Sequence, residues 1–360
     1  MADHPERIPK HLDEITPDWI NAHVFPDHGG NPVIDMTHQD IGDGRGFLSQ
    51  TFRVETNRAG PAAHLPESFV VKIRPDSAES RKAEEVINGF LREVRFYADV
   101  ARDTDARLTE VYFAEVNPDR AALVMEDLSH FKGGDQVVGL SHEQVRNVIR
   151  AIAPIHAAFW ESPALDGFNW APTSDYFHID HYAEGWPEFE AVYGLRIGPK
   201  ARAVGDYLAR NVDRLEDIIA NRPHSIVHGD LRADNILFGE DDHAGEVIIL
   251  DWQLVMRSLP ALDIARLYGG SEPVLERADR HRQVVGLWHS ELVRNGVTDY
   301  SGEAAWRDFQ LAMLHCTAIP VRNHVLFGKT PQKRSAQMRD AMAERFFSCV
   351  VEIDALEALK

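Results

Sequence analysis

Hydrophobic and polar residues alternate with two different periods along this chain, and the change of period divides it near residue 127. Before that point, short apolar runs rich in β-branched and aromatic residues predict strands, and a helical pattern fills residues 79–100. After it, apolar residues recur mainly with the spacing of a helix that turns one face toward a core. The five expected N-terminal strands lie around residues 33–36, 47–54, 69–73, 111–116 and 121–125.

This pattern predicts an α+β protein with two lobes. Residues 1–127 are expected to form a small β-rich lobe with one long helix, and residues 128–360 a larger, mainly helical lobe. In the second lobe only residues 235–238 and 247–250 have the composition of strands, and the polar turn between them predicts a short hairpin. The length of 360 residues suits two domains of ordinary size.

Composition and charge argue against several functional classes. With 38 Lys and Arg against 57 Asp and Glu, the net charge is −19, so a surface that neutralises nucleic-acid phosphates is not expected. The sequence has neither an apolar leader nor an apolar run of about 18 residues, so we expect neither secretion nor a membrane span. Cys316 and Cys349 have no CxxC partner, which favours a reducing cytoplasm.

The densest group of chemically active residues spans His228–Asn235 and is followed, 16 residues after Asn235, by Asp251. The predicted hairpin would bring Asn235 and Asp251 together at its open end. Amide and carboxylate oxygens are hard ligands that suit Mg²⁺, and Asp230 is placed to accept a proton from a hydroxyl group. The sequence therefore contains a candidate metal site beside a candidate base.

This arrangement, H-G-D-x-x-x-x-N followed by a strand that ends in Asp, resembles the catalytic and metal-binding loops of the aminoglycoside phosphotransferase and choline kinase superfamily. Asp251-Trp252-Gln253, where protein kinases carry Asp-Phe-Gly, is similar to the ecdysteroid-kinase-like (CHK kinase-like) group within it. The resemblance covers about residues 15–270. It implies a bilobal protein-kinase-like fold, ATP and Mg²⁺ as cofactors, Asp230 as the catalytic base, and Asn235 and Asp251 as metal ligands.

Lys72 and Glu93 are the second pair of residues that the resemblance requires. Lys72 lies inside the apolar strand at 69–73, and a buried ammonium group needs a partner for its charge. Glu93 lies on the apolar face of the helix at 79–100, where a carboxylate is unexpected without such a partner. We expect the two to pair and to orient the nucleotide phosphates. In the alternative, both lie at the edge of the lobe and Glu93 binds a neighbouring arginine.

The glycine-rich segment Gly42–Ser49 stands between the first two predicted strands, where a phosphate-binding loop belongs in this superfamily. Its G-x-G-x-G spacing fails the dinucleotide-binding pattern G-x-G-x-x-G, and three glycines in five residues are equally typical of a plain turn. The resemblance implies that the phosphate contacts come from Gly44, Gly46, Phe47 and Ser49.

The junction between the lobes would bind the adenine ring through main-chain groups. By resemblance, the Glu126 carbonyl and the Leu128 amide would contact the adenine edge and Met125 would line the pocket; a strand followed by an acidic turn is the plain alternative. Arg232 stands two residues after Asp230, where protein kinases carry a lysine that neutralises the transferred phosphoryl group. Simple solvent exposure is the alternative for Arg232.

Three other features are weighed against plainer interpretations. His156 lies on the apolar face of a helix predicted around 142–160, which favours a hydrogen-bonded core histidine over a functional one. By resemblance, Asp263 braces the catalytic loop, and His228 is expected to support that loop by hydrogen bonding. Residues 161–190 combine aromatic and acidic side chains without Lys or Arg, and they either shape an acceptor pocket or form a solvated loop with a few anchoring rings.

Together with the resemblance, these residues indicate a cytoplasmic, ATP- and Mg²⁺-dependent phosphotransferase that transfers the γ-phosphate to a hydroxyl group of a small molecule. The acceptor stays open among aminoglycoside-, macrolide-, choline- and steroid-like alcohols, and no nucleic-acid or membrane partner is expected. The alternative is a catalytically degenerate kinase fold that binds nucleotide without turnover. A two-metal phosphoesterase would need a closely spaced Asp-x-His pair on an early strand, which the β-rich part lacks.

Overall fold

The computed structural model describes residues 7–26, 32–42, 49–58, 65–75, 77–173, 181–277, 279–328 and 332–360. Contacts divide the chain into two compact units. The segment 251–254 belongs with the first unit, although its neighbours in sequence belong to the second. The first unit comprises Met1–Asp103, Leu108–His130 and Asp251–Leu254, and the second comprises Thr104–Arg107, Phe131–Leu250 and Val255–Lys360.

The first unit is built on a five-stranded antiparallel sheet with the order β1-β2-β3-β5-β4. Each strand overlaps one of the apolar runs that predict it, with ends shifted by a few residues. Helix α1 (Pro17–His23) begins after Thr16, whose hydroxyl accepts a hydrogen bond from the Trp19 amide at 3.2 Å. The strands are β1 (Val33–Asp40), β2 (Gln50–Arg58), β3 (Ser68–Ile73), β4 (Val111–Val116) and β5 (Ala121–Glu126).

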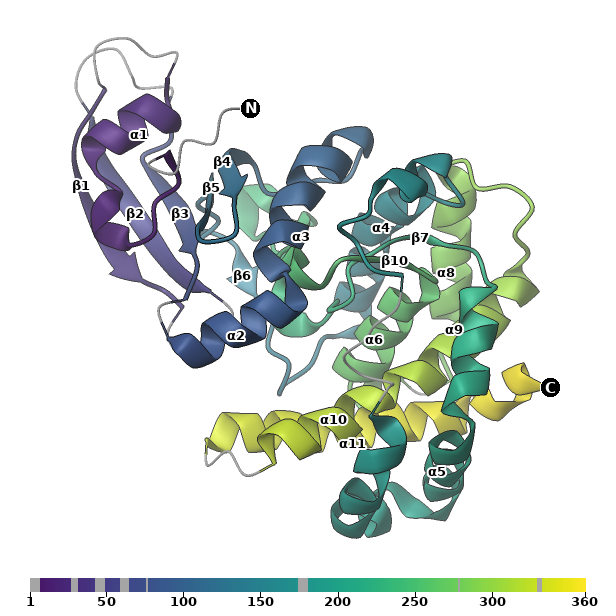
Figure 1. The fold of residues 1–360 in the computed structure, drawn as a ribbon. Coiled ribbons are helices and arrows are strands. Elements are labelled where there is room, and N and C mark those ends of the chain that lie inside the picture. Colours follow the sequence, from purple (N-terminus) through teal and green to yellow (C-terminus); the bar gives the residue numbers. More distant parts are fainter. Residues whose placement is uncertain are drawn as a thin grey trace. The chain divides into compact units, whose positions relative to one another are not determined.

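Alternation along the strands gives this sheet two apolar faces. One face, which includes Phe69 and Val71 of β3, packs with α1, and Figure 1 shows α1 lying across β1 to β3. The other face, which includes Leu123 of β5, packs against helix α3 (Gly89–Arg95). Because Lys72 follows Val71 in the strand, the same alternation turns its side chain toward α3.

The single helix predicted for residues 79–100 is interrupted in the structure. Helix α2 (Ala78–Ile87) ends at Asn88, which has a left-handed backbone with φ 54°, and α3 begins directly after it. Asparagine tolerates this conformation better than most residues, and the Phe90 amide donates to the Glu84 carboxylate across the break at 3.1 Å. The apolar spacing continues through the break, so the sequence pattern does not reveal it.

The second unit contains two small sheets. The predicted hairpin forms as β8 (Ile236–Phe238) and β9 (Val247–Ile249), and β6 (Lys132–Gly133) pairs with β8 on its other side. The pair β7 (Ser225–Val227) and β10 (Met256–Ser258) is absent from the sequence-based prediction, because three-residue strands are too short to show a period.

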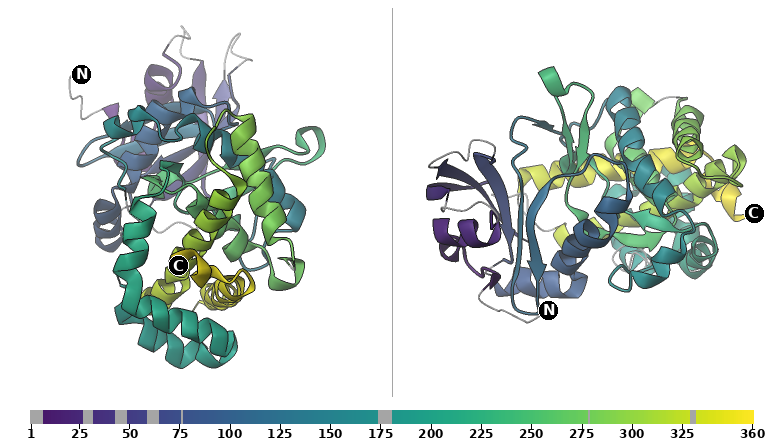
Figure 2. Two further views of the ribbon diagram at one scale, coloured as in Figure 1. Left: turned by 90° about the vertical axis from the view of Figure 1, so that its right-hand side faces the viewer. Right: turned by 90° about the horizontal axis from the view of Figure 1, so that it is seen from above.

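Helices make up most of the described part of the second unit. Every residue of α6 is buried, so this helix forms the centre of the unit's core, and α9 and α11 pack on it. Figure 2 shows α10 and α11, in yellow-green and yellow, close to the teal α5. None of the helices in the described ranges combines the length and the apolar character that crossing a membrane requires. The helices are α4 (His142–Ala158), α5 (Tyr182–Ala220), α6 (Ala261–Ser271), α7 (Val274–Arg277), α8 (His281–Arg294), α9 (Gly302–Cys316), α10 (Ala318–Phe327) and α11 (Lys333–Glu352).

Element α5 begins at Tyr182, but the non-helical backbone of Gly198, with φ 82°, interrupts it just before the helical pattern that the sequence shows at 200–220. A helical segment that the sequence does not predict therefore precedes the predicted one. Its first turns therefore include part of the aromatic segment for which an acceptor pocket and a solvated loop were the two interpretations. Tyr182, Trp186 and Phe189 are buried, and the rings of Trp186 and Phe189 lie 5.6 Å and 5.3 Å from the ring of Phe347 in α11. These rings pack the helices together.

Candidate active site

A buried ion pair joins the sheet and helix α3 in the first unit. The Lys72 ammonium nitrogen lies 2.7 Å from a carboxylate oxygen of Glu93, and the two side chains are 9 % and 1 % exposed. Lys72 also donates to Asp251 Oδ1 at 3.1 Å, and the Asp251 side chain is 40 % exposed. One ammonium group is thus held between two carboxylates, one buried and one open to solvent.

The charge state of Lys72 follows from these neighbours. Burial alone would lower the pKa of Lys72, because the ammonium group loses its hydration. The carboxylates of Asp251 and Glu93 outweigh burial and raise the pKa of Lys72 to about 12. Lys72 is therefore a cation at neutral pH, and this is the form that attracts a phosphate group.

The segment 251–254 is fixed to the first unit by an aromatic stack. Trp252 is fully buried, and its ring stacks on Phe96 with 3.7 Å between centroids and 9° between planes. Phe96 opens a π-helical turn, Phe96–Val100, which follows α3. Asp251 has φ 67°, a left-handed conformation that is uncommon for a residue other than glycine and recurs at functional sites. The stack therefore holds the residue that carries the exposed carboxylate.

The end of β5 carries the residues that we expect at the adenine site. Met125 is buried on the α3 face of the sheet, and Leu128 is buried just beyond the strand. The Glu126 amide donates to the Glu110 carbonyl at 2.9 Å, and the Glu126 carboxylate accepts from the Glu110 amide at 3.2 Å. These bonds fix the end of the strand. The main-chain contacts to adenine stay a prediction.

The expected phosphate loop falls largely outside the described residues. Gly44, Gly46 and Phe47 are not among the described residues. Ser49 is described, and its hydroxyl oxygen lies 3.5 Å from that of Thr51 near the start of β2. A role for these four residues in phosphate binding also stays a prediction.

In the second unit, Asp230 accepts hydrogen bonds on both carboxylate oxygens. Oδ1 accepts from the guanidinium of Arg266 in α6, and Oδ2 accepts from Arg232 Nε at 3.2 Å and from Asn235 Nδ2 at 3.1 Å. Burial alone would raise the pKa of Asp230, but the charges of Arg266 and Arg232 outweigh it and hold that pKa well below its ordinary value. Asp230 is therefore a carboxylate at neutral pH, and its side chain is 16 % exposed.

The loop around Asp230 is tied to the β8–β9 hairpin. Asn235 uses its amide nitrogen twice, donating to the Asp230 main-chain carbonyl at 2.9 Å as well as to the carboxylate. The Leu250 amide donates to the Asn235 carbonyl at 2.9 Å, and Asp251 is the next residue of the chain. His228 Nδ1 accepts from the Asp230 amide at 3.1 Å, and Nε2 donates to the Leu250 carbonyl at 2.9 Å. His228 thus supports the loop by hydrogen bonding, as the sequence predicts.

Asp263 braces the same loop from α6. Its carboxylate accepts from the main-chain amides of His228 at 2.7 Å and Gly229 at 3.0 Å. His156 Nε2 lies 3.2 Å from this carboxylate, while His156 Nδ1 accepts from Trp288 Nε1 at 3.2 Å. Since Nδ1 accepts, the ring proton lies on Nε2 and is donated to Asp263. His156 is a fully buried histidine with both ring nitrogens bonded, as its position on the helix predicts.

Two arginines next to the loop have no counterpart in the sequence-based expectations. Arg266 lies one helical turn after Asp263, and its presence in a wholly buried helix is the signal that points to it. Arg334, in the first turn of α11, pairs with Asp234 at 2.8 Å, and Asp234 also pairs with Arg232 at 2.6 Å. Nothing in the sequence distinguishes Arg334 from a solvated residue at a helix end.

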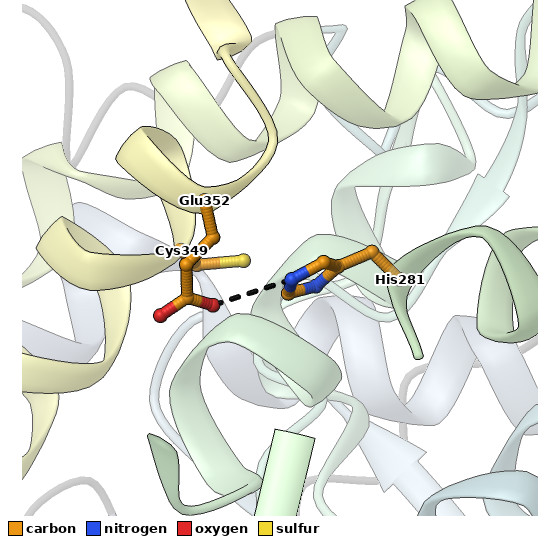
Figure 3. Close-up of side chains that lie close together, drawn as sticks. All are labelled: His281, Cys349 and Glu352. Atoms are coloured by element: carbon orange, nitrogen blue, oxygen red, sulfur yellow. Dashed lines mark ion pairs between the residues drawn. The ribbon is translucent and has the colours of Figure 1, made fainter. Parts of the chain in front are cut away.

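A separate group of side chains, His281, Cys349 and Glu352, comes from the start of α8 and the end of α11 (Figure 3). His281 Nε2 lies 3.4 Å from Glu352, and the same carboxylate accepts from Nε of the buried Arg277 at 3.1 Å. Burial raises the pKa of the Cys349 thiol to about 12, so the thiol keeps its proton at neutral pH. Because Arg277 already neutralises Glu352, we interpret this group as an ion-pair network that joins helices.

Comparisons with known proteins bear on the fold and the family. A sequence profile described as the phosphotransferase enzyme family matches residues 41–306. Among curated proteins, none matches this sequence. Among solved structures, a proposed aminoglycoside phosphotransferase from Ralstonia eutropha JMP134 is similar with a TM-score of 0.55 and 19 % identity, covering 93 % of this chain and 97 % of that chain.

Two further solved structures have the same fold. Aminoglycoside 2′-phosphotransferase-IIIa, in its GDP complex, has a TM-score of 0.53 and 11 % identity, with 91 % of this chain and 98 % of that chain covered. Ethanolamine kinase of Plasmodium vivax has a TM-score of 0.50 and 12 % identity, with coverages of 92 % and 89 %. These similarities confirm the α+β, protein-kinase-like fold expected from the sequence. The narrower likeness to the ecdysteroid-kinase-like group stays a prediction.

Proposed function

Because the chain belongs to the phosphotransferase enzyme family, we propose that it transfers the γ-phosphoryl group of ATP to a hydroxyl group of a small molecule, with Mg²⁺ as the metal. The observation that carries this proposal is the buried Lys72–Glu93 pair, with its ammonium group 2.7 Å from the carboxylate. A lysine held in this way by a helix carboxylate is the arrangement that kinase-type phosphoryl transfer uses to orient the nucleotide.

The nucleotide is proposed to bind on the first unit. Lys72, a cation at neutral pH, would contact its inner phosphates, and Glu93 would keep the ammonium group in place. Main-chain groups of Glu126 and Leu128 would bind adenine, and Met125 would line its pocket. The loop residues Gly44, Gly46, Phe47 and Ser49 would cover the phosphates.

Asn235 and Asp251 are the proposed ligands of Mg²⁺. Their chemistry fits this ion, which prefers hard oxygen donors. Asn235 donates to Asp230 through its amide nitrogen, so its amide oxygen would be the metal ligand, and the Asp251 carboxylate is 40 % exposed. When bound, Mg²⁺ would neutralise charge on the phosphate oxygens.

Asp230 is proposed to align the acceptor. The acceptor oxygen would form a bond to the γ-phosphorus while the bond from that phosphorus to the bridging oxygen breaks and ADP leaves. The hydroxyl proton would pass to the Asp230 carboxylate. Because its pKa is held low, Asp230 is a weak base, so it would act mainly by orienting the hydroxyl, as a loose transition state requires. Arg232 would neutralise charge on the transferred group.

The acceptor class is proposed from the family and from the proteins of similar structure. The buried rings of Tyr182, Trp186 and Phe189 are occupied in packing α5 on α11, so we do not assign the acceptor to them. The proteins of similar structure are named for aminoglycosides and ethanolamine. We propose an alcohol of the aminoglycoside-, macrolide-, choline- or steroid-like kinds.

An acceptor panel tests this function. The full chain is incubated with MgATP and, separately, with aminoglycosides, macrolides, amino alcohols and sterols, and ADP formation is measured against ATP alone. We expect one class to raise ADP formation, and Lys72→Met to abolish that increase. Nucleotide binding without acceptor-dependent ADP formation across all four classes would favour a catalytically degenerate kinase fold.

A further inference from the structure

Gln136 is a fully buried glutamine between β6 and α4, and it contacts the loop that carries Asp230 and Asn235. Its Oε1 accepts from the Ala233 amide at 2.9 Å, and its own main-chain amide donates to Asp234 Oδ1 at 2.9 Å. Both partners lie in the short stretch between the proposed base and the proposed metal ligand. Gln136 thus holds this stretch at two points, with its side chain on the Ala233 amide and with its main chain on the Asp234 carboxylate.

The remaining polar atoms of the Gln136 side chain are bonded to the core helix α6. Its Oε1 also accepts from the Ser271 hydroxyl at 3.1 Å, and its Nε2 donates to the Gly270 carbonyl at 2.8 Å. Bonds at both Oε1 and Nε2 fix the orientation of this buried amide. Gln136 therefore links the loop to α6 through hydrogen bonds on both sides of its amide group.

The backbone just before Gln136 lies in direct contact with the loop that carries Asp230 and Asn235. The Gly134 amide donates to the Ile236 carbonyl at 2.9 Å, and a Cβ added to Gly134 would lie only 2.3 Å from the Ala233 carbonyl oxygen. Only a glycine fits at this distance. We name residues Gly134–Val138 the brace segment, because they run beside the loop and contact it repeatedly.

Helix α11 holds the brace segment from its other side. Arg345 donates to the main-chain carbonyls of Gln136 at 2.8 Å and Val137 at 2.9 Å, and Arg334 pairs with Asp135 at 2.9 Å. Arg345 is buried, and these carbonyls accept from both of its terminal nitrogens. The loop is therefore fixed to α11 by way of the brace segment, in addition to its direct support from Asp263.

We propose that Gln136 is a positioning residue, whose acceptor oxygen holds the Ala233 amide and thereby sets Asp230 and Asn235 for phosphoryl transfer; this inference rests on the proposed function. The Ala233 amide also donates to the Ser271 hydroxyl at 3.2 Å, and that hydroxyl itself donates to the Gln136 oxygen. Removing the oxygen therefore takes away the shorter of the two bonds of the buried Ala233 amide together with the acceptor of Ser271, so the loop is held less firmly. Small displacements of reacting groups have large kinetic effects, so the turnover rate should fall more than nucleotide affinity.

The test compares two substitutions of Gln136 with a matched control. Gln136→Met keeps the length of the side chain and removes both polar atoms, whereas Gln136→Glu keeps an acceptor oxygen for Ala233. The control is Gln310→Met in α9, because Gln310 is also buried and donates to the Ile353 carbonyl at 2.8 Å, away from the loop. It reports the general effect of losing a buried glutamine.

We expect Gln136→Met to lower kcat by about 10- to 100-fold with KM for ATP changed by less than about threefold. Gln136→Glu should have a higher kcat than Gln136→Met, and Gln310→Met should keep kcat within about twofold of the original chain while losing thermal stability. Equal losses of kcat in Gln136→Met and Gln310→Met, or a Gln136→Met enzyme with unchanged kcat, would overturn the proposal.

A measurement that needs no turnover tests the positioning role of Gln136 separately from the proposed phosphotransferase activity. Amide hydrogen exchange over residues 228–236 reports how firmly the loop is held, whether or not an acceptor is known. Exchange there should be about 10-fold faster in Gln136→Met than in the original chain or in Gln310→Met. Unchanged exchange would contradict the positioning role, whereas faster exchange in a chain that phosphorylates no acceptor would leave that role standing and reject the proposed function.

Discussion

Two guanidinium groups contact Asp230, and this environment limits how the residue can act. Arg266 and Arg232 each donate to one of its oxygens, and together they hold its pKa well below the ordinary value against the opposing effect of burial. A carboxylate with a low pKa attracts a proton weakly, so it orients a hydroxyl more effectively than it deprotonates one. The residue keeps this charged form as pH falls below neutral.

Arg266→Met should shift the acidic limb of the pH–rate profile. Removing the guanidinium raises the folded-state pKa of Asp230, so the active carboxylate is lost at a higher pH as pH falls. The measurement is kcat/KM for the acceptor against pH, with Arg266→Lys as the control that keeps the charge. Coincident acidic limbs for Arg266→Met and the original chain would show that Arg266 does not set the protonation of Asp230.

Glu93→Gln should weaken nucleotide use and stability together. The substitution keeps the shape of the side chain and removes a buried charge 2.7 Å from Lys72, so we expect kcat/KM for ATP to fall by about 10-fold or more and the unfolding free energy by about 1–3 kcal/mol. Because the pKa of Lys72 is raised to about 12, the contribution of its charge is present at neutral pH and is lost as pH rises through 12. Burial raises the pKa of Glu93, so as pH falls its carboxylate is protonated at a higher pH than that of an exposed glutamate, and the charged pair is lost there.

Denaturant unfolding at pH 9 measures the stability difference. Glu85→Gln is the control, since Glu85 is an exposed glutamate of helix α2. Equal unfolding free energies for Glu93→Gln and Glu85→Gln would contradict the importance of the buried pair.

Among single residues, the sequence reveals those whose charge stands at a position where the pattern expects an apolar side chain. Lys72 in an apolar strand and Glu93 on an apolar helix face are each misplaced, and the structure pairs them as predicted. Arg266 stands at such a position in α6, but its partner lies 36 residues away in a loop, and no periodicity relates the two. Arg334 does not stand at such a position, so only the folded chain reveals its contact with Asp234.

Among the elements, the segment 251–254 packs against the turn that follows α3. Trp252 is fully buried against Phe96, and a Cβ on Gly89 would lie 3.2 Å from the Gln253 side chain. The π-helical turn at 96–100 presents the Phe96 ring to this stack, and such turns are frequent at functional sites. The stack therefore determines where Asp251 lies.

Trp252→Ala should destabilise the chain and lower its activity. Truncating a fully buried tryptophan leaves a cavity, for which we expect a loss of about 3–5 kcal/mol in unfolding free energy. Activity should fall as well, because Asp251 loses its support. Trp252→Phe keeps a ring against Phe96 and should retain most of both. Denaturant unfolding and kcat are the measurements, and a Trp252→Ala variant as stable as Trp252→Phe would contradict the role of the stack.

The sequence predicts long elements better than short ones. Five strands and the β8–β9 hairpin follow from composition and period, because each places several apolar residues in a row. The break at Asn88 depends on one residue adopting a left-handed backbone, and the apolar pattern on either side does not change. The β7–β10 pair is too short to carry a period, so it becomes visible only when distant parts of the chain meet.

For the whole molecule, a net charge of −19 must be reconciled with a polyanionic nucleotide. The described residues supply individual cations, Lys72 in the first unit and Arg232 and Arg266 in the second, and each of them is paired with a carboxylate. Local charges at short distance outweigh a diffuse field that salt screens beyond about 10 Å. The overall charge therefore does not argue against ATP.

Transfer of labelled γ-phosphate from ATP to the best acceptor of the panel, by the original chain and by Asp230→Asn, tests the central claim most directly. The substitution keeps the shape of the side chain and removes the carboxylate that would align the acceptor hydroxyl. The account predicts labelled acceptor with the original chain, a loss of about 10²- to 10⁴-fold in transfer rate with Asp230→Asn, and unchanged ATP affinity. Equal rates of labelled product from the two chains would contradict it.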